Sequence, residues 1–150
     1  MEETESRILE NYYENTSGGI ELKSIVNILK GKKSFVSLKG ANPKEISIAE
    51  KELKTVFAPD YHEYVSTFGA ASYYGHELTG VCKSNSLNVV DVTLLEREFN
   101  SVPMDWYVIE QTNIDGIVYW QSSDGKIYQT RPNKKPIIMY DSLLDYINQV

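Results

Sequence analysis

The clearest hydrophobic pattern in the chain begins at Asn42 and has the period of an α-helix. Asn42 and Pro43 supply an N-cap residue and a first-turn proline, and Glu45 stands where a capping box needs an acid. Apolar side chains then recur every three or four residues, which places them on one helical face. The pattern predicts a helix that ends before Pro59, and its inward residues are Ile46, Ala49, Leu53 and Val56, with Phe57 adjacent.

A second helix is predicted directly afterwards, from Pro59 to Phe68. The residue before a proline avoids the α conformation, so Ala58-Pro59 separates the two helices. Gly69 stands where a left-handed helix end is common. Two successive helices suggest a DNA-binding motif, but Asp60 and Glu63 are expected on the outer face and would repel phosphates. The predicted apolar face consists of Tyr61, Tyr64, Val65 and Phe68.

The pattern before residue 42 is weaker. Residues 5–13 place apolar side chains on one stripe and predict a short helix, which Gly18-Gly19 ends. Another helix is predicted from Ile20 to Leu29, with Gly31 closing it. Residues 34–38 alternate loosely and indicate a short strand.

After Gly69 the pattern changes to short strands and turns. Three β-forming runs lie between residues 106 and 130, and Asp-Gly pairs separate them, which is a strong hairpin signal. In the middle run, Val118 and Trp120 are expected on the face opposite to Tyr119. The runs are 106–111, 116–121 and 126–130, with turns at Asp115-Gly116 and Asp124-Gly125.

Two further elements complete the predicted order. Residues 88–92 are interpreted as a strand, and Thr93 to Glu96 as a capping box that opens a short helix to Phe99. At the end of the chain, Asp141-Ser142 is predicted to cap a helix that carries Leu143, Leu144 and Ile147. The order predicts an α+β fold, with N-terminal helices packed on a mainly antiparallel sheet and a closing C-terminal helix.

Composition indicates one globular domain over residues 1–150. The chain is 41% hydrophobic and 24% charged, close to ordinary averages. The acidic residues 1–5 lack the order of a signal peptide, and no apolar run approaches the roughly 20 residues of a membrane span. Because Cys82 is the single cysteine, no internal disulfide can form, and a cytoplasmic protein is expected.

Charge is spread unevenly along the chain. The net charge is −6, yet residues 55–124 carry ten acids and two bases, whereas residues 23–54 have a balance of +5. Binding to a phosphate backbone needs a basic surface, so no direct nucleic-acid partner is expected. An acidic segment favours attraction to a basic protein. The alternative is that these acids serve solubility alone.

The sequence contains no recognisable motif for a metal, a cofactor or catalysis. His62 and His76 are fourteen residues apart, and neither shares a short motif with Cys82. A nucleophile pair of Cys82 with His76 stays open, because such pairs meet in space and not along the sequence. Glu96 and Glu98 could serve as an acid–base pair but are typical of a solvated helix face. No cofactor and no metal are expected.

Eleven tyrosines are the compositional oddity of this chain. Tyr12, Tyr61 and Tyr64 lie on apolar stripes, which indicates core packing. Tyr73 and Tyr74 follow a predicted helix end in a segment punctuated by glycines. Tyrosine in a loop offers a large contact area with a polar tip, as protein interfaces favour. Two interpretations of this pair are therefore kept, a contact with a binding partner and packing in the core.

The order of these features resembles the SUKH superfamily, which contains bacterial immunity proteins and fungal regulators of cell-wall synthesis. One departure is Ala58, where the family commonly has leucine, and the segment 19–39 has no evident counterpart. The resemblance covers residues 42–150 and partly the N-terminal helix. It lies in Ile46, Glu50 and Leu53, the turn at 58–61, Tyr64-Val65, Phe68-Gly69, residues 102–109, 115–119 and 124–128, and the closing helix at 142–147.

The resemblance implies an immunity (antitoxin) protein that binds a cognate secreted toxin domain, often a nuclease, and has no catalytic residues of its own. The alternative is a cytosolic regulatory adaptor like the fungal relatives, which binds host proteins and has no toxin partner. Partner contacts vary within the family, so charge and composition supply the candidates within residues 73–124. The predicted partner-binding residues are Tyr73, Tyr74, Glu77, Glu96, Glu98 and Asp105.

Overall fold

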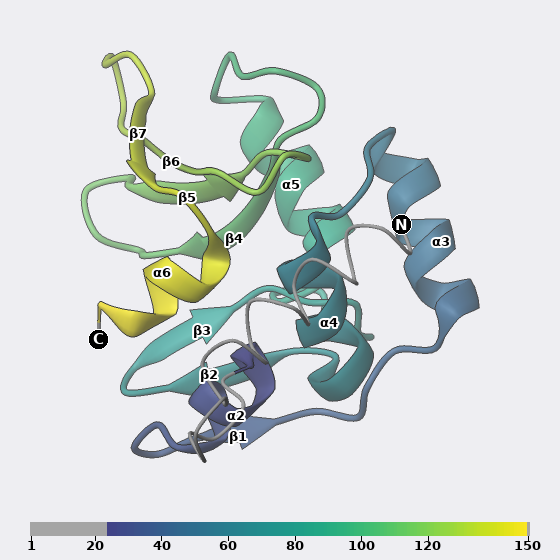
Figure 1. The fold of residues 1–150 in the computed structure, drawn as a ribbon. Coiled ribbons are helices and arrows are strands. Elements are labelled where there is room, and N and C mark those ends of the chain that lie inside the picture. The colour runs from purple at the N-terminus through teal and green to yellow at the C-terminus, as the bar shows by residue number, and fades with distance from the viewer. Residues whose placement is uncertain (1–23, 150) are drawn as a thin grey trace.

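The computed structural model describes residues 24–149 and shows an α+β fold built on one antiparallel sheet (Figure 1). The sheet is a meander, because every strand pairs with the next one along the chain. None of the described helices is long and apolar enough to cross a membrane. The strands are β1 (Val36–Ser37), β2 (Ala71–Tyr73), β3 (His76–Leu78), β4 (Tyr107–Gln111), β5 (Val118–Gln121), β6 (Ile127–Thr130) and β7 (Ile137–Tyr140). The helices are α2 (Ile25–Lys30), α3 (Pro43–Leu53), α4 (Pro59–Phe68), α5 (Val89–Arg97) and α6 (Leu143–Asn148).

The helix pair predicted from residue 42 is confirmed as α3 and α4. The Asn42 side chain accepts a hydrogen bond from the backbone N–H of Glu45 at 2.8 Å, and the Glu45 carboxylate accepts one from the N–H of Asn42 at 2.9 Å. The predicted capping box is therefore complete. α4 ends at Gly69, whose φ is 72°. Val56 was predicted to face inward, but it lies beyond the end of α3 and is 65% exposed.

The weaker predictions before residue 42 are confirmed in part. α2 ends at Gly31 as predicted, with Ile25 and Leu29 fully buried, but Ser24 is its extended N-cap, so the helix does not run unbroken from Ile20. The predicted helix at residues 5–13 and the predicted helix start at Ile20 lie outside the described residues. β1 confirms the short strand, at two residues.

The segment from residue 89 to 97 is helical, so the strand predicted at 88–92 is wrong. The Asn88 side chain accepts hydrogen bonds from the backbone N–H groups of Val90 at 2.8 Å and Asp91 at 3.4 Å, and so it caps α5. Thr93, predicted to be the cap, is fully buried inside the helix, where its hydroxyl accepts from the N–H of Val108 at 2.9 Å. The cap at Asn88 and packing on β4 override the strand preference of the valines.

The three strands predicted between residues 106 and 130 are confirmed as β4, β5 and β6. The pattern missed β2, β3 and β7. β2 and β3 are joined by Tyr74-Gly75, and their φ values of 53° and 83° fit a two-residue type I′ hairpin turn. Because this turn contains a tyrosine where asparagine or aspartate is usual, the hairpin signal was absent from the sequence.

Apolar side chains cover both faces of the β4–β6 part of the sheet, as the alternation in β5 predicted. On one face, Trp120 and Val118 pack with Trp106 and with Val92 of α5. On the other face, the ring of Tyr119 lies 4.9 Å from that of Tyr146 in α6. The larger cluster, on this second side, also takes in buried residues of α2, α3 and α4. The β4–β6 part of the sheet thus packs against Val92 of α5 on one face and against α6 on the other.

The backbone after β3 passes very close to the end of α4. A Cβ atom added to Gly80 would lie 1.7 Å from the carbonyl oxygen of Gly69, so no side chain fits at this position. The N–H of Val81 donates to the same Gly69 oxygen at 2.9 Å. This contact fixes the chain that leads into α5 against α4.

Candidate functional site

Tyr73 lies in the core, so its nomination as a partner contact is wrong for this folded state. The residue is in β2 and has no exposed surface. Its ring stacks on the imidazole of His76, with 5.3 Å between the ring centroids. Burial, followed by the charge of Glu110, raises the pKa of Tyr73. Of the two tyrosines, only Tyr74 is open to solvent, at 58% exposure in the β2–β3 turn.

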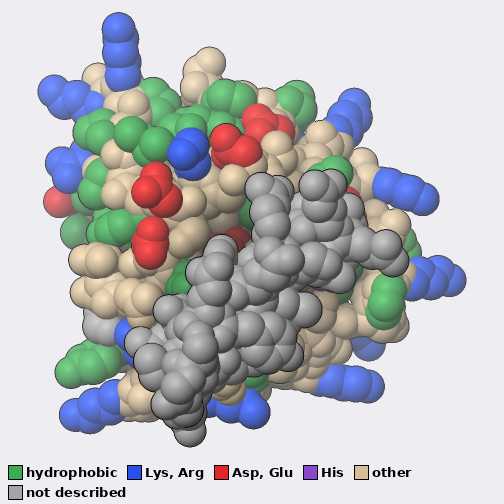
Figure 2. Space-filling model, viewed as in Figure 1, with side chains coloured by type: hydrophobic (Ala, Val, Ile, Leu, Met, Phe, Trp, Pro, Cys, Tyr) green, Lys and Arg blue, Asp and Glu red, His purple; other side chains and the backbone are tan. Residues whose placement is uncertain are grey.

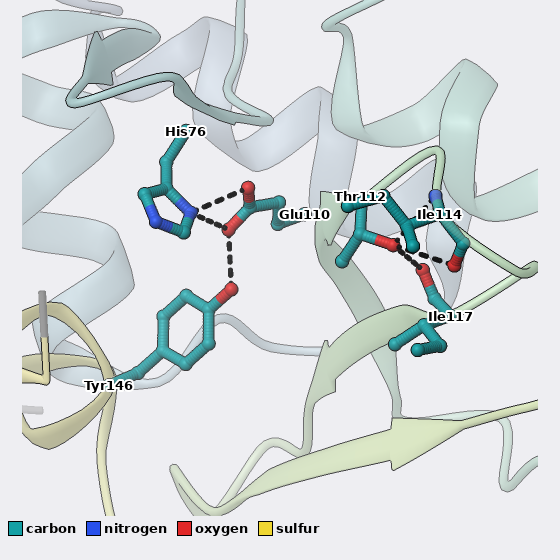
Figure 3. Close-up of polar contacts among 6 residues, drawn as sticks. All are labelled: His76, Glu110, Thr112, Ile114, Ile117 and Tyr146. Atoms are coloured by element: carbon teal, nitrogen blue, oxygen red, sulfur yellow. Dashed lines mark hydrogen bonds and ion pairs between the residues drawn. The ribbon is translucent and has the colours of Figure 1, made fainter.

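Tyr73 borders a polar cluster that joins β3, β4 and α6 (Figure 3). Nδ1 of His76 lies 2.9 Å from one carboxylate oxygen of Glu110, and the hydroxyl of Tyr146 donates to the other. Burial and the charge of Glu110 raise the pKa of Tyr146, which keeps this hydroxyl protonated and donating. Glu110 itself is 4% exposed. The cluster therefore ties the last helix to the middle of the sheet.

Asp60 was expected on an outer helix face, but the residue is half-buried and its carboxylate bonds to β5 and α6. Its carboxylate accepts hydrogen bonds from Nε2 of Gln121 at 3.0 Å and from the backbone N–H groups of Leu143 at 2.8 Å and Leu144 at 3.4 Å. Burial raises the pKa of Asp60, against the effect of these hydrogen bonds. The side chain accordingly holds the first turn of α6 against α4 and β5.

Part of the acidic charge of residues 55–124 does not reach the surface. Asp60 and Glu110 are held inside the networks just described. The side chain of Glu63 is half-buried, and burial together with the charge of Asp60 raises its pKa. The composition thus overstates the acidity of this surface. The exposed acids of the segment are Glu77, Asp91, Glu98, Asp115 and Asp124.

The environment of Cys82 does not activate its thiol. The residue is half-buried in the loop after β3, and burial raises its pKa. A nucleophilic cysteine needs the opposite shift, which exposes thiolate at neutral pH. The hydrogen-bonding nitrogen of His76 is directed at Glu110. Within residues 24–149, no three His, Cys, Asp or Glu side chains are grouped so that they could hold a metal ion.

The exposed side of α5 and the loop that follows it form the best candidate for a binding surface. Phe99 is 77% exposed and Met104 is 57% exposed, and both side-chain types are enriched in the centres of protein interfaces. The buried positions of α5 leave its remaining apolar residues facing outward. We define the α5 surface as the exposed residues Leu94, Leu95, Glu98, Phe99 and Met104.

Arg97 holds the backbone that carries the α5 surface in place. Its Nη2 lies 2.7 Å from the carbonyl oxygen of Met104, 3.1 Å from that of Leu53 and 3.2 Å from that of Trp106. One guanidinium thus joins α5 to the end of α3 and to the loop before β4. Burial lowers the pKa of Arg97.

The acids predicted to bind a partner near α5 differ in their hydrogen bonds and in their exposure to solvent. Glu96 accepts a hydrogen bond from Nε2 of Gln111 at 2.7 Å, and Asp105 accepts one from the hydroxyl of Ser123 at 2.8 Å. Glu96 thus links α5 to the end of β4, and Asp105 links the loop before β4 to the β5–β6 turn. Glu98 is exposed and belongs to the α5 surface, so it is the nominated acid best placed to meet a partner.

The sequence pattern identified the acids of this region and missed its apolar side chains. The residues of α5 that pack into the protein are Val89, Val90, Val92 and Thr93. Leu94 and Leu95 are exposed instead. Glu77 remains exposed on β3, so the nominated residues fall into two regions, the β2–β3 hairpin and the end of α5.

Comparison with known families places nearly the whole chain in one of them. Residues 21–150 match the SUKH_5 family model, described as SMI1-KNR4 cell-wall. The match includes nearly all of the segment 19–39, for which the sequence pattern offered no counterpart. A search of curated proteins finds no match. Because the family model spans far more than half of the chain and the α+β fold agrees with it, the chain belongs to the SUKH superfamily.

Proposed function

We propose that this chain is a bacterial immunity (antitoxin) protein, which binds a cognate secreted toxin domain in the cytoplasm and blocks it, and that it is not an enzyme. The observation that carries the proposal is the α5 surface. Four large apolar side chains stand open to solvent there beside an exposed acid, on α5 and the loop after it, and Arg97 fixes the end of this helix to two neighbouring segments. Membership of the SUKH superfamily makes a protein-binding role the natural use of such a surface.

The α5 surface suits a partner with a basic site. Asp91 and Glu98 are both exposed on α5, next to the apolar side chains. In such an interface the apolar and aromatic anchors supply most of the affinity, while the acids steer association and select the partner. A nuclease carries a basic groove for phosphate groups, and a protein that covers this groove prevents substrate from binding. We therefore propose a nuclease toxin as the partner.

Coexpression with the toxin domain encoded beside this chain's gene tests the proposal. Cells that produce the toxin domain alone should die, and cells that also produce this protein should survive. The two purified proteins should form a stable complex, and the toxin should lose its cleavage of nucleic acid when the complex forms. The absence of both rescue and complex formation for every adjacent toxin domain would refute the immunity role and leave the regulatory adaptor as the alternative.

A further inference from the structure

The sheet ends in an edge strand that carries exposed apolar side chains. Within residues 24–149, β7 pairs with β6 alone. All residues from 131 to 139 are exposed, including Ile137 at 50%, Ile138 at 52% and Met139 at 38%. Figure 1 shows the β6–β7 hairpin projecting from the body of the fold, and Figure 2 shows hydrophobic side chains gathered over the part of this face where β7 lies. An edge of this kind is able to pair with another strand.

The protection of this edge is partial. Lysine, proline and bulges commonly keep sheet edges from pairing, and Lys134, Lys135 and Pro136 precede β7. The pairing of β7 with β6 also shifts register between Ile127 and Tyr128. The strand itself contains no charge. The opposite edge, β1, has only two residues, so β7 is the edge with the greater length for pairing.

We propose that β7 pairs antiparallel with β7 of a second copy of this chain and forms a twofold-symmetric dimer. In a register centred on Ile138, Ile137 of each copy lies opposite Met139 of the other. Continued past both ends of β7, the same register sets Lys135 opposite Asp141, and symmetry repeats this contact. Apolar residues thus meet apolar residues, and opposite charges meet twice, which stabilises cross-strand pairs. Twofold dimers use one self-complementary patch in this way.

The dimer is weak and compatible with toxin binding. Four-residue strands bury a small area, and interfaces below about 1,200 Å² are typical of transient contacts. Association should therefore be reversible and depend on concentration. α5 packs on β4, and β5 and β6 separate β4 from β7 in the sheet order. The inference does not rest on the immunity role, because its evidence comes from the β7 edge and not from the α5 surface.

Sedimentation velocity from micromolar to millimolar protein tests the pairing. We expect a monomer–dimer equilibrium for the unmodified chain. Ile138→Lys should weaken dimerisation at least tenfold, because the twofold register sets the two new charges against each other. Val36→Lys, which places the same charge on the 61%-exposed residue of β1, should leave dimerisation unchanged. Circular dichroism and thermal unfolding establish that both variants are folded.

A charge exchange tests the register. Lys135→Glu and Asp141→Lys should each weaken the dimer, and the double variant should restore it. Asp141 also lies 3.8 Å from Lys126, but both side chains are largely exposed, so this ion pair contributes little to stability. The proposal is overturned if the chain stays monomeric throughout the range or if Ile138→Lys dimerises normally. It is also overturned if Ile138→Lys impairs only the capture of a toxin domain by the monomer, since the edge would then bind the toxin.

Discussion

The guanidinium of Arg97 donates to the carbonyl oxygen of Met104 at 2.7 Å, which links the last turn of α5 to the loop that leads into β4. The residues between these two points, including Phe99, are thereby confined to one loop around the guanidinium. A surface that is already ordered before it binds loses less conformational entropy on association. The bond thus connects the stability of the fold with the shape of the proposed binding surface.

Replacing Arg97 should affect stability and binding together. Arg97→Ala removes the donor to three carbonyl oxygens and should lower the free energy of unfolding by about 2–3 kcal/mol, since hydrogen bonds to charged groups are strong. Urea denaturation measures this loss. Arg131→Ala serves as the control, because Arg131 is exposed, and should change stability by less than about 0.5 kcal/mol. Equal losses in the two variants would show that Arg97 does not anchor the loop.

The hydroxyl of Tyr146 should matter more than that of its neighbour Tyr140. Tyr146→Phe leaves the buried carboxylate of Glu110 without one of its two donors and should cost about 1–3 kcal/mol of unfolding free energy. Tyr140 contacts Tyr146 through its ring, with centroids 5.6 Å apart, so Tyr140→Phe should be nearly neutral. Thermal unfolding of the two variants compares them directly. A neutral Tyr146→Phe would mean that Glu110 does not depend on this bond.

Local signals in the sequence were enough to predict the parts of the fold that local contacts decide. The capping box at Asn42 and the Asp-Gly turns need only neighbouring residues, and the structure contains them all. Residues 88–92 favour a strand by propensity, yet the cap at Asn88 and packing on β4 make them helical. The cap at Asn88 is a local signal that the pattern overlooked, whereas the packing on β4 depends on contacts distant in sequence that the pattern could not supply.

The sequence predicted the exposed acid of the candidate site but not its exposed apolar side chains. Glu98 was identified as an acid on a solvated helix, and it is exposed. Leu95 lies on the outer side of α5 and Phe99 in the loop after it, and their exposure depends on which residues of α5 pack inward, which the sequence pattern did not predict. Glu110 and Asp60 were counted as surface acids, because a sequence does not show which carboxylates find buried donors from distant elements.

Asp60 should make stability depend on pH. Because burial raises its pKa above 3.8, the folded protein holds the Asp60 proton at higher pH than the unfolded chain does. This contribution to stability is complete below pH 3.8 and is lost as pH rises through the raised folded-state pKa. Asp60→Asn lacks the titration, so the wild type should lose stability relative to the variant as pH rises. Urea denaturation at a series of pH values measures both proteins, and a relative gain by the wild type would contradict this prediction.

Cys82 should react slowly with thiol reagents and should be dispensable for protection. Burial raises the pKa of its thiol, so little thiolate is present at neutral pH. We expect a rate of reaction with a disulfide reagent below that of free cysteine, increasing as pH rises. Cys82→Ala should protect cells from the toxin as the wild type does. A fast-reacting thiol, combined with lost protection in Cys82→Ala, would favour an enzyme.

Affinity for the purified cognate toxin domain, measured by calorimetry, tests the α5 surface most directly. Phe99→Ala should weaken binding at least tenfold, as loss of a central aromatic anchor does. Glu98→Lys should weaken it most at low salt, where charges are least screened. Glu98 is preferred to Glu96 for this reversal, because Glu96 also bonds to Gln111.

The exposed residues of the β2–β3 hairpin provide the matched comparison, since they were nominated from the same sequence and lie on other strands. Tyr74→Ala and Glu77→Lys should bind the toxin domain as the wild type does. The account predicts that only the two α5 variants, Phe99→Ala and Glu98→Lys, lose affinity. Unchanged binding by both of them, or an equal loss in Tyr74→Ala and Glu77→Lys, would contradict it.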